Sequence, residues 1–163
     1  MQRVWFDRTF DELTPLQLYR IVELRERVFV VEQACIYLDA DGLDLQARHL
    51  WAESDERSAT AALPGEAAPP NGGAVLIDAY LRIVPAGVKF EELSIGRVIV
   101  APHARGTGLG KELMQRGIAA ARGVPIRIGA QAHLEKFYAE LGFARASEDF
   151  VEDGIPHLEM LRR

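Results

Sequence analysis

The sequence has a single cysteine, no apolar run long enough to cross a membrane, and no excess of basic residues. With only Cys35, an internal disulfide and a cysteine-rich zinc site are excluded, which suits a reducing cytosol. We expect Cys35 to be a half-buried structural thiol. Because a membrane helix needs about 18 or more consecutive apolar residues, we predict a soluble cytoplasmic protein with no membrane partner.

The balance of charge narrows the class of partner. Nineteen Lys and Arg residues against 24 Asp and Glu residues give a net charge of −5, and no basic run is interleaved with aromatic residues. A nucleic-acid surface is therefore not expected. The 163 residues suit one domain, 1–163, whose core can bury roughly two-thirds of the surface of the unfolded chain.

Hydrophobic periodicity predicts alternating strands and helices. Thr14 can cap a helix with Gln17 completing a capping box and Pro15 in its first position, so we predict a helix over 15–30. A second helix is expected over 109–121 and a third over 134–141. Strands are expected at 2–6, 49–53, 79–84, 94–100, 125–130, 144–151 and 155–161, the last two joined as a hairpin across Asp153-Gly154.

Two segments interrupt this pattern. The segment 32–48 is an acidic loop that contains Asp39, Asp41 and Asp44, and a loop of this length is usually functional or mobile. The segment 55–74 is rich in alanine, proline and glycine and has no core-forming pattern. We therefore predict a flexible surface insertion at 55–74.

The most informative feature is a glycine-rich turn between the strand 94–100 and the following helix, with the sequence Arg105-Gly106-Thr107-Gly108-Leu109-Gly110-Lys111. Such a turn leaves backbone N–H groups unpaired at the positive end of a helix dipole, where a phosphate can approach closely. The turn is not a P-loop, because Glu112 replaces the required Ser or Thr and Arg105 replaces the first glycine. It is not a dinucleotide fingerprint either, since the glycine spacing differs and no carboxylate lies about 20 residues later.

The pattern Arg105-x-x-Gly108-x-Gly110 resembles the Arg/Gln-x-x-Gly-x-Gly/Ala signature of the GNAT N-acetyltransferase superfamily. Further segments resemble the ElaA-like branch of that family, and together they extend over nearly the whole chain: Phe29-Val30-Val31-Glu32-Gln33, the acidic loop up to His49, Arg97-Val98-Ile99-Val100, and Asp153-Gly154-Ile155-Pro156-His157. The insertion 55–74 is not explained by the resemblance.

The resemblance implies an α/β fold of the GNAT type. This fold is a mixed, mostly antiparallel sheet with helices on both faces and a central parallel pair of strands that splay apart at the CoA site. The co-substrate would be acetyl-CoA, with its pyrophosphate held by Arg105, Gly106, Thr107, Gly108, Leu109, Gly110 and Lys111. The pantetheine arm would pair with the backbone of Val98, Ile99 and Val100, and Gln131 would line the channel.

The resemblance also assigns chemistry to particular side chains. Tyr138 matches the tyrosine that protonates the departing thiolate in many members, although a phenol with an ordinary pKa of about 10 must be close to the sulphur to do so. Glu32, His49 and His157 are alternatives for the base that removes a proton from the acceptor amine. Arg97 lies in an apolar strand, and we expect it to meet a carboxylate such as Asp41 or Asp44.

These residues predict direct acetyl transfer to a primary amine of a small molecule or peptide, with no metal and no covalent enzyme intermediate. The acidic loop would favour a cationic acceptor. Two alternatives stay open, a non-catalytic module that binds acyl-CoA and a nucleotide-binding protein that uses the same turn. The acceptor, the base and a homodimeric state are not decided at this level.

Overall fold

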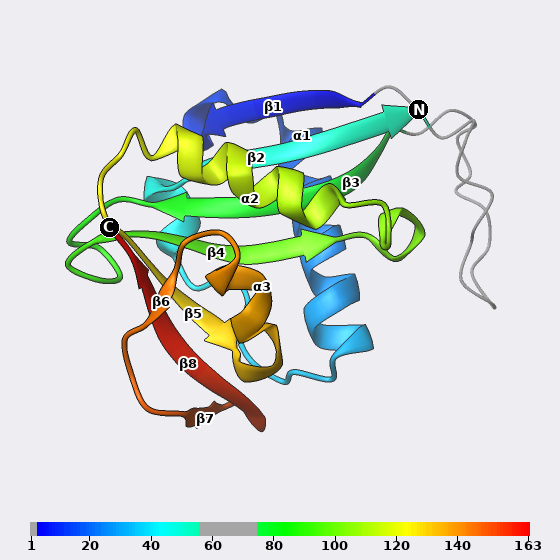
Figure 1. Ribbon diagram of the computed structural model, residues 1–163. Coiled ribbons are helices and arrows are strands. Elements are labelled where there is room, and N and C mark those ends of the chain that lie inside the picture. Colours follow the sequence, from blue (N-terminus) through cyan, green and yellow to red (C-terminus); the bar gives the residue numbers. More distant parts are fainter. Residues whose placement is uncertain (1–2, 56–74) are drawn as a thin grey trace.

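The computed structural model describes residues 3–55 and 75–163, which form a sheet covered by helices on both faces (Figure 1). The sheet order is β1-β2-β3-β4-β5-β8-β6, with β7 paired to β8. The strands are β1 (Val4–Thr9), β2 (Arg48–Asp55), β3 (Val75–Val84), β4 (Leu93–Val100), β5 (Ile126–Gln131), β6 (Ala144–Arg145), β7 (Phe150–Glu152) and β8 (Ile155–Arg162). Apart from Asp55, the predicted insertion 55–74 lies outside the described residues.

The first helix begins as its sequence predicts but changes its geometry. Thr14 accepts a hydrogen bond from the Gln17 N–H and the capping box is complete, so α1 (Pro15–Arg25) starts at Pro15. The prediction of one regular helix to residue 30 is wrong, because the chain widens into the π-helical segment η2 (Glu26–Glu32). There the Gln33 N–H donates to the carbonyl of Val28, five residues earlier. The wider turn keeps Val28 buried and leaves Val31 exposed.

The helices on each face of the sheet pack against a separate apolar core. On one face, α2 (Leu109–Ala120) and α3 (Glu135–Ala139) pack with the larger core, which includes Leu81, Ile95 and Leu158. On the other face, α1 and η2 pack with Trp51, Tyr80 and Ile99. Among the described residues, no helix is long and apolar enough to span a bilayer.

The parallel pair opens soon after it begins. β4 and β5 pair only at Leu93↔Ile126 and Ser94↔Arg127, whereas the other strand pairs of the described chain are antiparallel. Beyond Ser94 the two strands diverge toward their carboxyl ends. The predicted fold, a mostly antiparallel sheet with a splayed parallel pair and helices on both faces, is confirmed.

A bulge in β4 was not predicted. Tyr80 pairs with Ile99 and Arg82 with Gly96, so that Arg97 and Val98 together oppose Leu81. Arg97 takes a positive φ of 53°, a conformation that few side-chain-bearing residues adopt. The bulge turns the Arg97 guanidinium toward Asp39, 2.7 Å away.

The C-terminal hairpin is more broken than expected. β7 and β8 are joined across Asp153-Gly154 as predicted. The prediction of a single strand over 144–151 is wrong, because the chain leaves the sheet between β6 and β7. Ser147 there accepts a hydrogen bond from the Glu159 N–H through its hydroxyl, so a side chain replaces the ladder partner.

Candidate active site

The candidate site is the opening between β4 and β5 at their carboxyl ends. The chain leaves β4 at Val100 and passes through a glycine turn into α2, while β5 ends at Gln131 and leads to α3 (Figure 1). The end of η2 faces both segments, because Glu32 contacts Arg105 and Gln33 contacts Gln131. Three segments far apart in the sequence therefore meet at this opening.

The three alternating glycines have different roles. Gly106 and Gly108 have φ values of 75° and 82°, in the left-handed region that glycine adopts without strain. A Cβ at either position would meet no atom within 4 Å, so the outer side of the turn is open. A Cβ at Gly110 would lie 3.4 Å from Cγ2 of Val100, which is an ordinary van der Waals contact, so alanine would also fit between α2 and β4 at this position.

The turn leads directly into the N-terminus of α2. Gly108 is the N-cap of α2, so the N–H groups of Leu109 and Gly110 have no carbonyl partner within the helix, whereas the Lys111 N–H donates to the carbonyl of Gly108 at 3.1 Å. The Thr107 hydroxyl donates to the carbonyl of Ala104 at 2.8 Å, and the Leu109 side chain is buried in the core. Both residues can therefore donate to a ligand only through their backbone N–H groups, whereas the Lys111 side chain is exposed.

The predicted strand positions lie on the free edge of β4. Ile99 is buried toward α1, and Val98 and Val100 pack against the α2 core. Because β4 no longer pairs with β5 beyond Ser94, the β5-facing backbone groups of this segment are not used by that strand. The carbonyl of Val100 accepts a hydrogen bond from Arg105 Nε at 3.1 Å.

Comparison with known proteins identifies this arrangement. A family model described as an acetyltransferase (GNAT) domain matches residues 73–163, which is more than half of the chain. The chain belongs to the GNAT acetyltransferase family. ElaA of Escherichia coli is 38% identical over 166 residues, which cover 97% of this chain and 95% of ElaA.

Solved structures agree with this membership. The crystal structure of Escherichia coli ElaA matches with a TM-score of 0.81 and 35% identity, covering 99% of this chain and 100% of that one. An acyl-CoA N-acyltransferase from Pseudomonas aeruginosa matches with a TM-score of 0.81 and 37% identity over the same shares. The resemblance to the ElaA-like branch is confirmed, and membership of the GNAT family supports an acyl-CoA-dependent transferase.

Tyr138, the acid that the GNAT resemblance suggests, lies on α3 with 7% of its surface exposed. Its ring contacts those of Phe137 and Phe143 edge-on, and its hydroxyl has no hydrogen-bond partner in residues 3–55 and 75–163. Burial raises the pKa of Tyr138 to about 12. The phenol therefore keeps its proton at neutral pH.

The two histidines differ in their surroundings. His157 on β8 pairs with Gln131 at the end of β5, and its Nδ1 lies 2.8 Å from the carbonyl of Ile155. His49 is completely buried, with Nδ1 2.8 Å from the Tyr80 hydroxyl and Nε2 3.1 Å from the carbonyl of Asp44. Burial lowers the pKa of His49. Since a carbonyl only accepts, Nε2 donates and Nδ1 accepts from Tyr80, so no ring nitrogen of His49 is left for a substrate.

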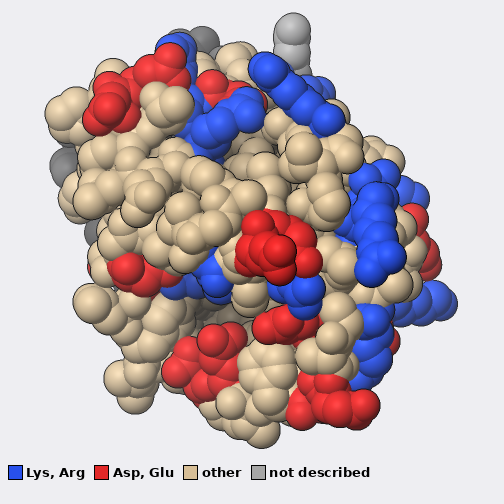
Figure 2. Space-filling view, turned by 90° about the vertical axis from the view of Figure 1, so that its left-hand side faces the viewer, with Lys and Arg blue, Asp and Glu red and all other residues tan. Residues whose placement is uncertain are grey.

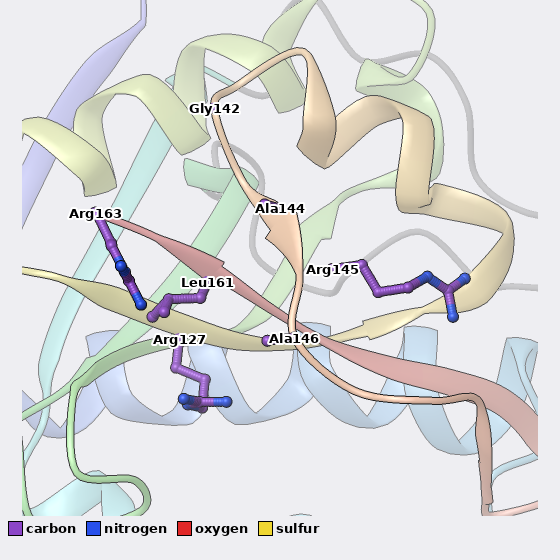
Figure 3. A pocket seen from close by; sticks show the side chains of 7 residues that line it. All are labelled: Arg127, Gly142, Ala144, Arg145, Ala146, Leu161 and Arg163. Atoms are coloured by element: carbon purple, nitrogen blue, oxygen red, sulfur yellow. The ribbon is translucent and has the colours of Figure 1, made fainter.

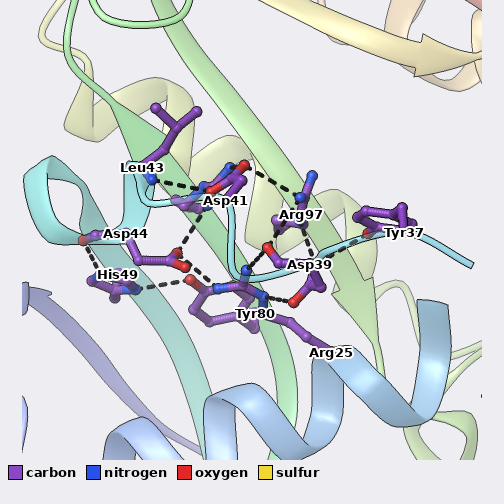
Figure 4. A network of polar contacts seen from close by, with 10 residues as sticks. Arg25, Tyr37, Asp39, Asp41, Leu43, Asp44, His49, Tyr80 and Arg97 are labelled. Carbon is purple, nitrogen blue, oxygen red and sulfur yellow. Dashed lines mark hydrogen bonds and ion pairs between the residues drawn. The ribbon is translucent and has the colours of Figure 1, made fainter. Parts of the chain in front are cut away.

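The acidic loop also differs from its predicted role. Its aspartates are held by arginines of this chain. Arg25 binds Asp39 and Asp44, each at 2.7 Å (Figure 4). Arg82 binds Asp41 at 2.7 Å. Arg97 meets Asp41 at 3.3 Å, one of the two carboxylates expected from the sequence, and it also meets Asp39 at 2.7 Å, which was not expected. The loop is therefore a nearly neutral, fixed layer, and these carboxylates do not favour a cationic acceptor.

Contacts of Arg25, Arg82 and Gln33 were not predicted from the sequence. The signal for Arg25 was present, because it follows Ile21 by four residues and precedes Val28 by three, on the buried face of the helix. Arg82 lies between Leu81 and Ile83 in an apolar strand, and its side chain is 2% exposed. Gln33 lies in the segment 29–33 that carries the family resemblance, but no role was predicted for its side chain.

Acid should loosen the aspartate layer. Burial alone would raise the pKa of Asp41, but its hydrogen bonds with Arg82 lower that pKa to about 2. The pKa of Asp44 is raised by burial and lowered more strongly by Arg25 and Arg82. Folded pKa values below the unfolded value of about 3.9 give stability above pH 4 that is lost as pH falls toward 2. We expect the free energy of unfolding in urea to fall over this range, and Asp41→Asn to flatten the fall. Parallel pH curves for the two proteins would contradict this account.

A surface pocket of about 650 Å³ lies elsewhere, at the β5–β8–β6 side of the sheet (Figure 3). Two of the arginines that line it are already paired, Arg127 with Glu92 and Glu159, and Arg145 with Glu135 and Asp149. Figure 2 shows that on this side of the molecule acidic and basic side chains are interspersed. The pocket shares no lining residue with the glycine turn.

Proposed function

We propose that this protein transfers the acetyl group of acetyl-CoA directly to a primary amine of a small molecule or peptide. The observation that carries the proposal is the splayed β4 edge leading into an open, left-handed glycine turn at the N-terminus of α2. Unpaired N–H groups and the helix dipole there suit the pyrophosphate of CoA. The fit is supported by the free space outside Gly106 and Gly108.

The rest of the site supplies the groups that acyl transfer needs. The free backbone edge of Val98, Ile99 and Val100 can pair with the pantetheine arm, with Gln131 across the opening. A backbone N–H at Ile99 or a neighbour can stabilise the oxygen of the thioester as negative charge develops on it. Tyr138 holds a proton for the leaving thiolate, and Glu32 or His157 can take one from the ammonium of the acceptor.

The donor assignment is tested by binding. A ligand bound only by the native state raises its melting temperature as concentration increases. We expect CoA to stabilise the protein and ATP at the same concentrations to have little effect. Stabilisation by ATP without any by CoA would indicate a nucleotide-binding protein instead.

Transfer is tested with a panel of amines and a thiol-release assay using acetyl-CoA. Release of free CoA above the rate of hydrolysis, together with the acetylated amine, is the expected result. Tight CoA binding with no turnover on a broad panel would favour a non-catalytic acyl-CoA-binding module.

Gly108→Val should weaken CoA binding about tenfold or more. A β-branched residue at a φ of 82° is strained by roughly 1–3 kcal/mol, and relief of that strain would turn the N–H groups of the turn away from the phosphates. Isothermal titration with CoA measures the effect. Gly123→Val is the matched control, because Gly123 has a φ of 81° and equally open space but lies beyond the far end of α2. Unchanged CoA affinity in a folded Gly108→Val protein would mean that the glycine turn does not bind the pyrophosphate of CoA.

A further inference from the structure

Two neighbouring residues at the end of η2 hold both sides of the β4–β5 opening. The Glu32 carboxylate binds the Arg105 guanidinium in a bidentate pair, with oxygen–nitrogen distances of 2.6 and 2.9 Å. On the β5 side, the Gln131 amide donates to Gln33 Oε1 at 3.1 Å. We call Glu32 and Gln33 the clasp.

Glu32 of the clasp occupies the Arg105 guanidinium, which the pyrophosphate of acyl-CoA would also bind. All three nitrogens of the Arg105 guanidinium have partners, because Nη1 and Nη2 bind Glu32 and Nε binds the carbonyl of Val100. A pyrophosphate arriving at the turn must therefore compete with a carboxylate for this cation. Planar, bidentate recognition by arginine serves phosphate and carboxylate alike, so the exchange replaces one anion by another.

The Glu32–Arg105 pair is suited to exchange rather than to holding the fold together. Its side chains are 41% and 43% exposed, and exposed ion pairs contribute only about 0.2–1 kcal/mol. The contrast is with Asp39, which is 8% exposed and bound to buried Arg25. An anionic ligand can displace Glu32 without breaking the buried layer.

We propose that Glu32 links the binding of the two substrates: the phosphates of acyl-CoA displace its carboxylate from Arg105, and the released carboxylate then attracts the acceptor ammonium. This inference rests on the proposed function. Because Glu32 contacts a guanidinium that also touches Val100, its carboxylate is released at the carboxyl end of β4, beside the free edge. Acyl-CoA then binds first, and it creates the negative charge that the amine meets.

Titration of CoA into four proteins tests the exchange: wild type, Glu32→Gln, Arg105→Gln and the double variant. Removing an exposed competing ion pair should make CoA binding about 2- to 5-fold tighter in Glu32→Gln. In the Arg105→Gln background the same substitution should change the affinity by less than about 1.5-fold, because a carboxylate that competes for Arg105 has then lost its target.

A matched control separates competition from net charge. Glu112→Gln removes the same charge from the first turn of α2, where Glu112 pairs with Arg116 at equal exposure rather than with Arg105. It should leave CoA affinity nearly unchanged. Three results would each contradict the competition between Glu32 and CoA for Arg105. They are an equal gain in CoA affinity in Glu112→Gln, a gain from Glu32→Gln that persists in the Arg105→Gln background, and weaker CoA binding in Glu32→Gln. Failure of the wild type to bind CoA would overturn the proposed function itself.

The acceptor side gives a readout that a merely structural residue would not produce. With an amine that the panel shows to be acetylated, Glu32→Gln should raise the KM for that amine several-fold while the dissociation constant for CoA falls. Loss of a structural contact would weaken both substrates together. Movement of both constants in the same direction therefore contradicts the proposed link.

Discussion

Tyr138→Phe should lower kcat about 10²- to 10⁴-fold while leaving CoA affinity and the fold almost unchanged. This range is what a well-placed general acid contributes. The substitution removes only the hydroxyl, and that hydroxyl has no hydrogen-bond partner in the described parts of the chain. The rings of Phe137 and Phe143, which contact Tyr138 edge-on, can pack against phenylalanine equally well.

The surroundings of Tyr138 determine which protonation state the phenol has. Burial raises its pKa to about 12, so the proton stays on the phenol throughout the neutral range. A thiol has an ordinary pKa of about 8.5, so transfer of the proton to the thiolate is uphill and depends on close approach.

The experiment measures kcat by thiol release and compares Tyr19→Phe, the same chemical change at a 69% exposed position on α1. Tyr19→Phe should keep the wild-type rate. If Tyr138→Phe also turned over at the wild-type rate, Tyr138 would be a core aromatic residue and another group would protonate the thiolate.

Arg25→Met should lower the free energy of unfolding by about 3–5 kcal/mol, the cost of breaking a buried ion pair by removing one partner. The Arg25 side chain is 1% exposed and holds the carboxylates of Asp39 and Asp44 at 2.7 Å, and it donates to the carbonyl of Asp39 at 2.9 Å. Methionine fills much of the volume but leaves these buried acceptors short of a cation.

Urea denaturation at pH 7 measures this loss. Arg116→Met is the control, because the Arg116 guanidinium is 46% exposed, pairs with Glu112 and lies over the Trp5 ring. Its loss should cost about 1 kcal/mol or less. Equal effects of the two substitutions would mean that the arginine–aspartate layer contributes no more than a surface pair.

Features that depend on neighbouring residues could be predicted from the sequence. The capping box of Thr14 and Gln17 formed because both partners lie within one turn of helix. The glycine turn adopts left-handed conformations at Gly106 and Gly108, which few other residues tolerate. The parallel pair followed from a strand, a helix and a second strand in succession.

Features that join distant residues could not be predicted in this way. Arg97 was expected to meet Asp41 or Asp44, and it meets Asp39 first because a bulge in β4 redirects its side chain. His49 looked available at the start of a strand, yet Tyr80, 31 residues away, takes one of its nitrogens. No local pattern encodes either contact.

The sequence by itself determined the glycine turn and the strand and helix on either side of it, because backbone preferences and hydrophobic periodicity act over a few residues. Only the tertiary structure decided which charged groups face that turn. Glu32 and Arg105 are 73 residues apart, and the packing of η2 across the β4–β5 opening brings them together. Packing also brings the aspartates of the acidic loop into ion pairs with Arg25, Arg82 and Arg97. Charge pairing between distant segments is set by how the layers pack, and therefore had to be read from the folded chain.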